Sequence, residues 1–316
     1  MKKEQIIVLG ANGQIGTVLT EELRKVYGTN NVLATDLQKH PVQEGLFEQL
    51  DILNAQRLNE VVENRQITQI YHLAAILSAR GEQNPKWAWD INMTGLFNVL
   101  EVAKNYNCKV FFPSSIAVFG SEAPKENTPQ HAVLQPKTVY GISKVAGEHW
   151  CNYYHEKYNV DVRSVRYPGI IGYQSMPGGG TTDYAVEIYH KALQGEVFQC
   201  FLSAETKLPM MYMPDAIRAT LELMAAPAEQ IKVRTSYNIA GMSFTPDEVY
   251  KAIQQQVPDF QITYAPDFRQ AIADSWPYSI DDSPAREDWH WQPEYDLESM
   301  TKDMLVHLGE KYTVGS

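Results

Sequence analysis

The sequence has few cysteines and lacks long apolar runs. Three cysteines occur among 316 residues, and none lies in a Cys-x-x-Cys pair. This spacing argues against a disulfide framework or a structural zinc site and favours a reducing, cytoplasmic location. No run approaches the roughly 18 apolar residues that a membrane helix needs. The apolar stretch 6–9 is also too short for the core of a signal peptide, so we expect a soluble protein without a membrane partner.

Positive charge is scarce as well. Lys and Arg number 27 against 38 Asp and Glu, a formal net charge of −11. An acidic protein repels nucleic acid and anionic membranes, so we expect neither as a partner. The eight histidines form no His-x-x-x-His pair and no Cys/His cluster. His149 and His155 are six residues apart, which places them on different faces of a helix. The sequence therefore predicts no metal site.

The first half of the chain alternates short apolar runs with amphipathic stretches. Runs without polar alternation predict buried strands, at residues 6–9, 32–34, 70–73 and 110–112. The stretches between them predict helices, at residues 15–26, 55–64 and 91–106. Strands separated by helices predict right-handed βαβ crossovers, and hence an α/β fold with a doubly wound parallel sheet of Rossmann type.

The pattern changes beyond about Pro168. Pro177–Gly180 predicts an irregular, flexible loop. Further elements are expected as a helix over 184–193, a returning strand over 236–240, and a last helix over 297–308 that Asp296 would N-cap. The tryptophans of the tail, Trp276, Trp289 and Trp291, are interpreted mainly as packing residues. We expect a larger domain of residues 1–168 and 212–240, interleaved with a smaller α/β domain of residues 169–211 and 241–316.

A glycine-rich turn follows the first predicted strand, in Gly10-Ala-Asn-Gly13-Gln-Ile-Gly16. Gly10 would permit the tight turn and Gly13 the approach of a pyrophosphate, while Gly16 would let the next helix pack closely on the strand. The N-terminus of that helix attracts phosphates through its N–H groups and its dipole. The turn therefore predicts a dinucleotide site.

Acidic residues after the next strands bear on the choice of dinucleotide. Asp36 lies twenty residues past Gly16. Its carboxylate would accept hydrogen bonds from the adenosine ribose and repel a 2′-phosphate, which favours NAD over NADP. A capping role for Asp36 is the alternative. Asp51 and Ile52 are candidate adenine contacts, although an aspartate in such a place often starts the next helix.

A phenol and an ammonium group lie four residues apart, at Tyr140 and Lys144, on one face of a predicted helix. The cation and the helix dipole predict a lowered pKa for Tyr140. A tyrosinate is a competent general base toward an alcohol. Ser114 and Ser115 follow the strand 110–112, where hydroxyls face the ligand crevice of a parallel sheet. Ser115 is therefore predicted to bind the reacting oxygen; turn formation is the alternative role of both serines.

The Ser–Tyr–Lys set and the Gly-x-x-Gly-x-x-Gly turn resemble the extended short-chain dehydrogenases/reductases, the NAD-dependent epimerase/dehydratase family. Further matches, in the family's order, are His72-Leu-Ala-Ala75, Asn92 with Gly95, and Arg166-Tyr-Pro-Gly169. The resemblance implies NAD as cofactor, Lys144 on the nicotinamide ribose, and Asn92 supporting Lys144 in a proton relay. The cofactor-binding residues predicted in this way are Gly10, Gly13, Gln14, Ile15, Gly16, Asp36, Asp51, Ile52, Leu73, Ala74, Ala75, Asn92, Ser114, Tyr140, Lys144, Tyr167 and Ile170.

Two activities within that family compete. A nucleotide-sugar 4-epimerase needs cationic clamps for a diphosphate, and between Tyr173 and Pro214 the sequence offers only Lys191 and Lys207. Residues 175–185, 273–291 and 113–120 and the pair Leu77-Ser78 instead resemble the short-chain-type L-threonine 3-dehydrogenases. A non-catalytic dinucleotide sensor is a third class, but such proteins have typically lost the tyrosine or the lysine.

The threonine dehydrogenase resemblance implies metal-independent oxidation of L-threonine at its side-chain hydroxyl to 2-amino-3-oxobutanoate. Tyr140 would be the base and Ser115 would orient the oxygen. The substrate-binding residues that it implies are Ser78, Ser115, Tyr140, Gly180, Thr181 and Trp276. For Ser78, Gly180, Thr181 and Trp276 a purely structural role is the alternative. The family also implies a homodimer, formed through helices over 87–106 and 140–158.

Overall fold

The computed structural model describes residues 4–38, 44–178 and 180–314. The chain falls into two compact units. The first takes its residues from 1–115, 138–166 and 217–237, and the second from 116–137, 167–216 and 238–316. In the described part of the chain, no helix has both the length and the apolar composition that a membrane span requires.

Residues 116–137 mark the main difference from the predicted domain boundaries, which put them in the first domain. In the structure they belong to the second unit. The Lys125 ammonium donates to the carbonyls of Asp274 and Trp276 at 2.6 and 2.8 Å. Thr128 forms a parallel bridge with Ile280. The segment follows a strand of the first unit in sequence, but its backbone and side-chain partners come from the tail.

The first unit is built on a seven-stranded sheet with the order β10-β6-β5-β4-β1-β2-β3. Its strands are β1 (Ile6–Leu9), β2 (Val32–Asp36), β3 (Phe47–Gln49), β4 (Gln69–His72), β5 (Lys109–Ser115), β6 (Val162–Tyr167) and β10 (Tyr237–Asn238). β1 pairs in parallel with both β2 and β4, so the strand order reverses there. The doubly wound parallel sheet of the prediction is confirmed. The short β3 was not predicted, and the strand expected over 236–240 is only two residues long.

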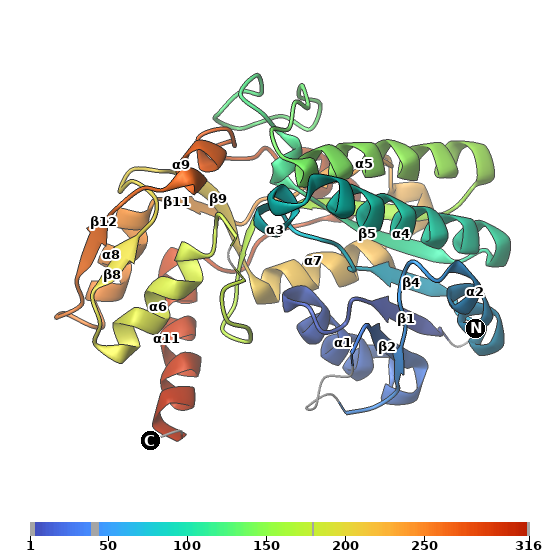
Figure 1. The fold of residues 1–316 in the computed structure, drawn as a ribbon, viewed down its shortest axis with the longest axis horizontal. Coiled ribbons are helices and arrows are strands. Elements are labelled where there is room, and N and C mark those ends of the chain that lie inside the picture. The colour runs from blue at the N-terminus through green and yellow to red at the C-terminus, as the bar shows by residue number, and fades with distance from the viewer. Residues whose placement is uncertain (1–3, 39–43, 179, 315–316) are drawn as a thin grey trace. The chain divides into compact units, whose positions relative to one another are not determined.

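Helices cover both faces of this sheet. They are α1 (Gln14–Tyr27), α2 (Ala55–Arg65), α3 (Ser78–Gln83), α4 (Pro85–Tyr106), α5 (Val139–Tyr158) and α7 (Met213–Ala225), the last from residue 217 on, with short 3-10 turns at Thr29–Asn31 and Ala228–Gln230. Figure 1 shows α4 and α5 side by side on one face and α1 and α7 on the other. Buried residues of β1, β4 and β5 and of α2, α4 and α5 share one apolar core.

Capping residues set the ends of the two long helices. The Asn84 side chain accepts from the N–H of Trp87 and starts α4, and Thr138 accepts from Gly141 N–H at the start of α5. Asn107 and Asn159 end these helices in the left-handed conformation, which asparagine tolerates better than most residues. Because Asn84 caps it, α4 starts at Pro85, six residues before the predicted Ile91.

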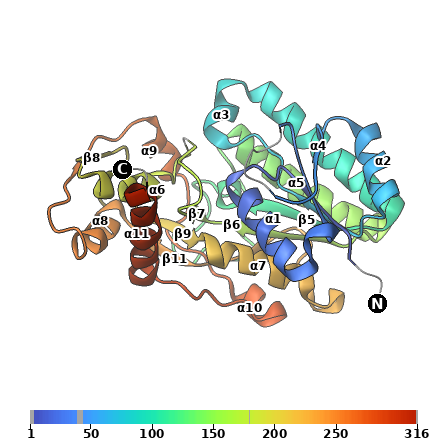
Figure 2. The same cartoon turned by 90° about the horizontal axis from the view of Figure 1, so that it is seen from below.

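The second unit contains two small sheets and a set of helices. Its strands are β7 (Gly169–Ile171), β8 (Phe198–Cys200), β9 (Leu208–Tyr212), β11 (Met242–Phe244) and β12 (Ile262–Tyr264), arranged as β11-β9-β7 and β12-β8. Its helices are α6 (Tyr184–Gln194), α8 (Pro246–Gln254), α9 (Phe268–Ala273), α10 (Ser283–Trp289) and α11 (Leu297–Val314), with a 3-10 turn at Ile116–Val118. Helices α6, α8 and α11 pack against one another (Figure 2).

Local predictions for the second unit are confirmed in several places. The Asp296 carboxylate accepts from the Ser299 N–H at 2.8 Å and caps α11, which runs six residues beyond its predicted end. Trp291 is fully buried, and its indole nitrogen donates to the Ala240 carbonyl at 3.2 Å. Of the predicted loop Pro177–Gly180, Gly179 lies outside the described residues.

Candidate active site

The glycine turn between β1 and α1 is as close-packed as its sequence predicts. Gly10 has a φ of 84°, and a Cβ there would lie 2.7 Å from the backbone nitrogen of Ala74. A Cβ on Gly16 would lie 2.2 Å from the Gly10 carbonyl oxygen. Side chains are therefore excluded at both positions by the backbone itself. Gly13, the N-cap of α1, differs, because its Cβ would meet the Gly10 oxygen at an ordinary 3.4 Å.

The position of this turn fits a dinucleotide. It lies at the carboxyl end of β1, beside the loop that follows β4, at the point where the strand order reverses. Gln14 and Ile15 open α1, whose first N–H groups and positive dipole end suit a phosphate. The fold itself would tolerate a small side chain at position 13. A ligand that approaches the backbone closely would instead require glycine there.

Asp36 has the capping role that was its alternative, and its contact with the ribose stays a prediction. Its Oδ2 accepts from the Asn12 N–H at 3.0 Å and its Oδ1 from the Leu37 N–H at 2.7 Å. The carboxylate is thereby held next to the glycine turn, at the end of β2. A carboxylate accepts about four hydrogen bonds, so these two leave capacity for ribose hydroxyls.

Asp51 has a local role in the structure. It is exposed, and its Oδ1 accepts from the Leu53 N–H at 2.9 Å, which forms a turn. Asn54, not Asp51, caps α2 through the Arg57 N–H. Ile52 is buried against α4 where Gly95 leaves room for it. Their contact with a cofactor stays a prediction.

Residues after β4 line the same edge of the sheet. Leu73 continues the strand pairing, with its N–H donating to the Leu9 carbonyl at 2.8 Å. Ala74 and Ala75 follow it and are partly buried. Ser78 is the first residue of α3 and is 9 % exposed.

The structure brings Ser115, Tyr140 and Lys144 together. Ser115 ends β5 and Tyr140 opens α5; both are partly buried, and their side chains are hydrogen-bonded. The buried Lys144 ammonium lies 5.4 Å from the centre of the Tyr140 ring and 4.7 Å from that of Phe112. It donates to the Pro113 carbonyl at 2.6 Å. A phenol, a hydroxyl and an ammonium are thus held side by side from two elements.

The pKa of Tyr140 differs from the sequence-based expectation. Burial raises it to about 12, and the hydrogen bond from Ser115 acts in the opposite direction. Burial also lowers the pKa of Lys144 to about 8. The prediction of a lowered tyrosine pKa is wrong for the protein without ligands, because the removal of water disfavours the phenolate more than the neighbouring groups favour it.

Asn92 connects α4 to the start of α5. Its Oδ1 accepts from the Ile76 N–H at 2.7 Å, and its Nδ2 donates to the Ser143 hydroxyl at 3.2 Å. Ser143 in turn donates to the Tyr140 carbonyl at 2.7 Å. Asn92 therefore holds the loop after β4 and the first turn of α5 in one network, close to Lys144.

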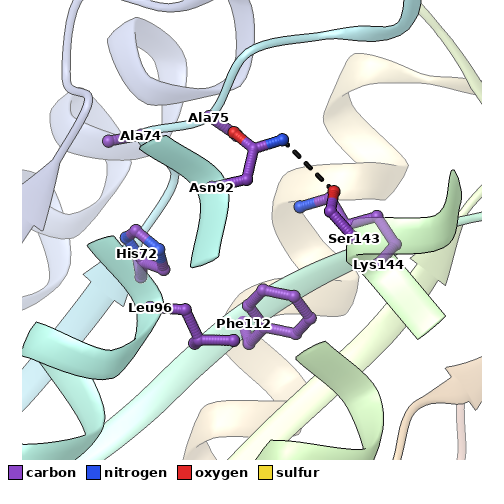
Figure 3. Close-up of a pocket in the computed structure, with 8 residues that line it drawn as sticks. All are labelled: His72, Ala74, Ala75, Asn92, Leu96, Phe112, Ser143 and Lys144. Atoms are coloured by element: carbon purple, nitrogen blue, oxygen red, sulfur yellow. Dashed lines mark hydrogen bonds between the residues drawn. The ribbon is translucent and has the colours of Figure 1, made fainter. Parts of the chain in front are cut away.

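A small cavity of about 10 Å³ lies behind this network (Figure 3). It is lined by His72, Ala74, Ala75, Asn92, Leu96, Phe112, Ser143 and Lys144. That volume is about what one buried water molecule needs. Burial and the charge of Lys144 lower the pKa of His72 to about 3, so this imidazole is neutral. Its Nδ1 has no hydrogen-bond partner among the described residues.

Ser114 has a hydrogen-bond partner within the first unit, and its contact with the cofactor stays a prediction. It is 2 % exposed, and its hydroxyl donates to Glu148 Oε1 at 2.6 Å. Glu148 also pairs with Arg166 through two hydrogen bonds, of 2.9 and 2.8 Å. The sequence analysis did not identify Glu148. Its place four residues after Lys144, on the same helix face, was an available signal.

Five predicted site residues belong to the second unit. Tyr167 ends β6 and its hydroxyl reaches the Ala216 carbonyl at 3.4 Å; Ile170 lies in β7. The Gly180 N–H donates to Asp183 Oδ2 at 2.7 Å. Thr181 and Trp276 are buried. The cofactor and substrate roles of these five residues stay predictions.

Comparisons with known proteins give the family. A relative from Staphylococcus aureus, described as an uncharacterized epimerase/dehydratase, is 50 % identical over 319 residues, covering 99 % of both chains. The solved GalE-like L-threonine dehydrogenase from Cupriavidus necator, in its holo form, is 56 % identical with a TM-score of 0.95, covering 96 % of this chain and 99 % of that one. A monomeric L-threonine 3-dehydrogenase from metagenomic data is 49 % identical with a TM-score of 0.95, covering 97 % and 99 %.

The family-level match extends over both the glycine turn and the Ser–Tyr–Lys set. The sequence model of the NAD dependent epimerase/dehydratase family matches residues 6–240. NAD, the cofactor of that family, agrees with the carboxylate of Asp36 at the end of β2. This chain belongs to the NAD-dependent epimerase/dehydratase family.

Proposed function

We propose that this protein oxidises the side-chain hydroxyl of L-threonine with NAD⁺ and forms 2-amino-3-oxobutanoate. The observation that carries the proposal is the Ser115–Tyr140–Lys144 group, set at the sheet edge beside the glycine turn. The chain is also 49–56 % identical over nearly its whole length to proteins named as L-threonine dehydrogenases, which favours threonine as the alcohol.

In this proposal Tyr140 is the general base that takes the proton of the threonine hydroxyl. Ser115, bonded to Tyr140, orients the same oxygen. The Lys144 ammonium makes the phenolate less costly than it would be without a nearby cation. Bound NAD⁺ supplies a cationic ring that accepts the hydride from the hydroxyl-bearing carbon. The carbon thus loses a hydride and the oxygen a proton, which leaves a ketone.

The residues that would hold NAD⁺ are the glycine turn at the pyrophosphate and Asp36 at the adenosine ribose. Leu73, Ala74 and Ala75 would border it beside β4, and Lys144 would bind the nicotinamide ribose. Ser78, Gly180, Thr181 and Trp276 would hold threonine.

The first experiment mixes the protein with L-threonine and NAD⁺ in the presence of a chelator and follows the absorbance of NADH. We expect turnover with L-threonine and much slower turnover with D-threonine or with NADP⁺. Absence of NADH formation from folded protein would contradict the proposal and direct the test to nucleotide sugars. An epimerase retains its nicotinamide and releases no net NADH.

The Tyr140→Phe variant tests the assigned base. We expect turnover to fall by about two to four orders of magnitude, because general bases contribute about 10²–10⁴-fold to a rate. The dissociation constant for NAD⁺, measured by calorimetry, should stay close to that of the wild type. Wild-type kcat in this variant would remove Tyr140 from its proposed role.

We also propose that two copies associate through α4 and α5. Aromatic and apolar side chains are exposed on these helices: Trp89, Ile142, Trp150, Tyr153 and Tyr158. Trp150 packs against Tyr153 at 5.4 Å and Tyr153 against Tyr158 at 6.1 Å between ring centres, which joins these three rings of α5 into one apolar patch. Such patches commonly mark protein interfaces. Since one relative is described as monomeric, the oligomeric state requires measurement.

A further inference from the structure

Three buried polar side chains that the proposed reaction does not use are hydrogen-bonded to one another, and one of them, Glu148, lies one helical turn beyond Lys144. They are Glu148 on α5, Arg166 on β6 and Ser114 on β5, which are 1 %, 4 % and 2 % exposed. Glu148 Oε1 accepts from Ser114 Oγ at 2.6 Å and from Arg166 Nε at 2.9 Å. Its Oε2 accepts from Arg166 Nη2 at 2.8 Å. We refer to these three residues as the Glu148 cluster.

A gain in folding stability is a weak explanation for a buried ion pair between Glu148 and Arg166. Burying two charges carries a desolvation cost that their attraction often only offsets, and apolar residues of similar volume can stabilise a core as well. The Glu148 cluster is nevertheless fully hydrogen-bonded and fixed in geometry. Its neighbours in the sequence indicate what that geometry serves.

The cluster joins the two elements that carry the reacting residues. Ser114 directly precedes Ser115 at the end of β5, and Glu148 lies one turn after Lys144 on α5. The helix approaches the strand so closely that a Cβ on Gly147 would lie 2.5 Å from the Phe112 ring. The bond from Ser114 to Glu148 fixes the end of β5 relative to α5, and with it the contact between Ser115 and Tyr140.

The carboxylate also acts on Lys144 through its charge. Burial lowers the pKa of Lys144 to about 8, and Cys151 and Glu148 oppose that shift. The other titratable groups at Lys144 carry little charge: His72 from β4 is neutral, burial raises the pKa of the Cys151 thiol, and Tyr140 is protonated at neutral pH. Glu148 therefore provides the negative charge that favours the ammonium form.

We propose that Glu148, paired with Arg166, is a positioning residue of the reaction. It holds Ser115 against Tyr140, and it keeps a carboxylate, stabilised by Arg166, one turn from Lys144. This inference rests on the proposed function for its proton transfer, though not on threonine as the substrate. Glu148 touches neither substrate nor cofactor in this role; it acts through Ser114 and Lys144.

The test compares the pH profile of kcat in three variants. Glu148→Gln keeps the size of the side chain and an acceptor for Ser114, but removes the charge. Because Lys144 then loses its proton more easily, the plateau of kcat should fall at least fivefold and the rising limb should end at a lower pH. Ser114→Ala keeps the charge, so its kcat should fall while the limb stays in place. The dissociation constant for NAD⁺ should change less than twofold in both.

A control is a second arginine–carboxylate pair of the first unit. The buried Arg163 pairs with Asp161 at 2.9 Å at the start of β6, and this carboxylate, which is 28 % exposed, also pairs with Arg234 at 2.7 Å. Asp161→Asn should lower the melting temperature but leave both the limb and the plateau unchanged. A Glu148→Gln profile that resembles this control, with stability lost and the limb unmoved, would overturn the proposal.

If Glu148→Gln does not fold, Glu148→Gln/Arg166→Met leaves no unpaired charge. A wild-type plateau in that double variant would equally overturn the proposal. Failure of the proposed function appears separately, as a wild type that forms no NADH from L-threonine; the same profiles are then measured with whichever alcohol or nucleotide sugar the wild type converts.

Discussion

Tyr140 must lose its proton before it can act as a base in the proposed reaction, and its buried surroundings raise its pKa. Burial raises the pKa of Tyr140 to about 12 and lowers that of Lys144 to about 8. We therefore expect kcat/KM to rise up to about tenfold per pH unit from about pH 6, as more phenolate forms, and to level off above about pH 8, as the ammonium loses its proton. Steady-state rates at constant ionic strength measure this. A flat profile between about pH 6 and about pH 8 would contradict the assignment.

His72 predicts how stability depends on pH. Its folded pKa of about 3 lies below the ordinary value of 6.5, because it is buried near Lys144. The unfolded chain therefore binds a proton that the folded chain does not. Stability is complete above about pH 6.5 and falls by up to about 1.4 kcal/mol per pH unit toward pH 3.

The measurement compares His72→Gln, which cannot titrate, with the wild type in urea unfolding at several acidic pH values. We expect a shallower loss of unfolding free energy in the variant. His131→Gln, at an exposed position, is the control. Parallel curves for the wild type and the His72 variant would show that this buried imidazole does not contribute.

At the scale of the elements, we expect two glycines of the turn between β1 and α1 to have different roles: Gly16 is needed for the fold, and Gly13 for ligand binding. Gly16→Ala would place a Cβ 2.2 Å from a carbonyl oxygen, so we expect about 1–3 kcal/mol less stability. Gly13→Ala fits the fold at 3.4 Å, so stability should change by about 0.5 kcal/mol or less. The affinity for NAD⁺ should nevertheless fall about tenfold or more, about 1.4 kcal/mol.

Chemical denaturation and calorimetry with NAD⁺ measure these two effects independently. Equal loss of stability in both variants would mean that Gly13 also serves the fold. Unchanged NAD⁺ binding in Gly13→Ala would mean that the pyrophosphate does not approach this residue.

At the scale of the whole molecule, the apolar patch on α5 predicts self-association. Trp150→Glu/Tyr153→Glu places two charges in the patch, so we expect a dimeric wild type to sediment as a monomer once it carries both changes. Val306→Glu, at an exposed position on α11, should leave the sedimentation unchanged. A wild type that is monomeric at micromolar concentration would contradict the proposed interface.

Sequence patterns were sufficient to predict the features that depend on local spacing. The glycine turn, the four-residue step from Tyr140 to Lys144 and the carboxylate at the end of β2 follow from helix and strand periodicity, and the structure has them in those elements. The parallel sheet also followed, because alternating strands and helices leave few alternatives. The same local signals carry the family resemblance.

Which groups lose contact with water, and which side chains contact one another, depends on the folded chain and could not be predicted from local patterns. The direction of the Tyr140 pKa shift depends on burial, which no spacing reports. Ser114 donates to Glu148, a partner 34 residues away on another element that no local pattern reports. Residues 116–137 joined the second unit through contacts with a tail about 150 residues away in sequence, for example from Lys125 to Trp276. Such long-range contacts depend on the whole folded chain, whereas a sequence pattern predicts one helix or strand at a time.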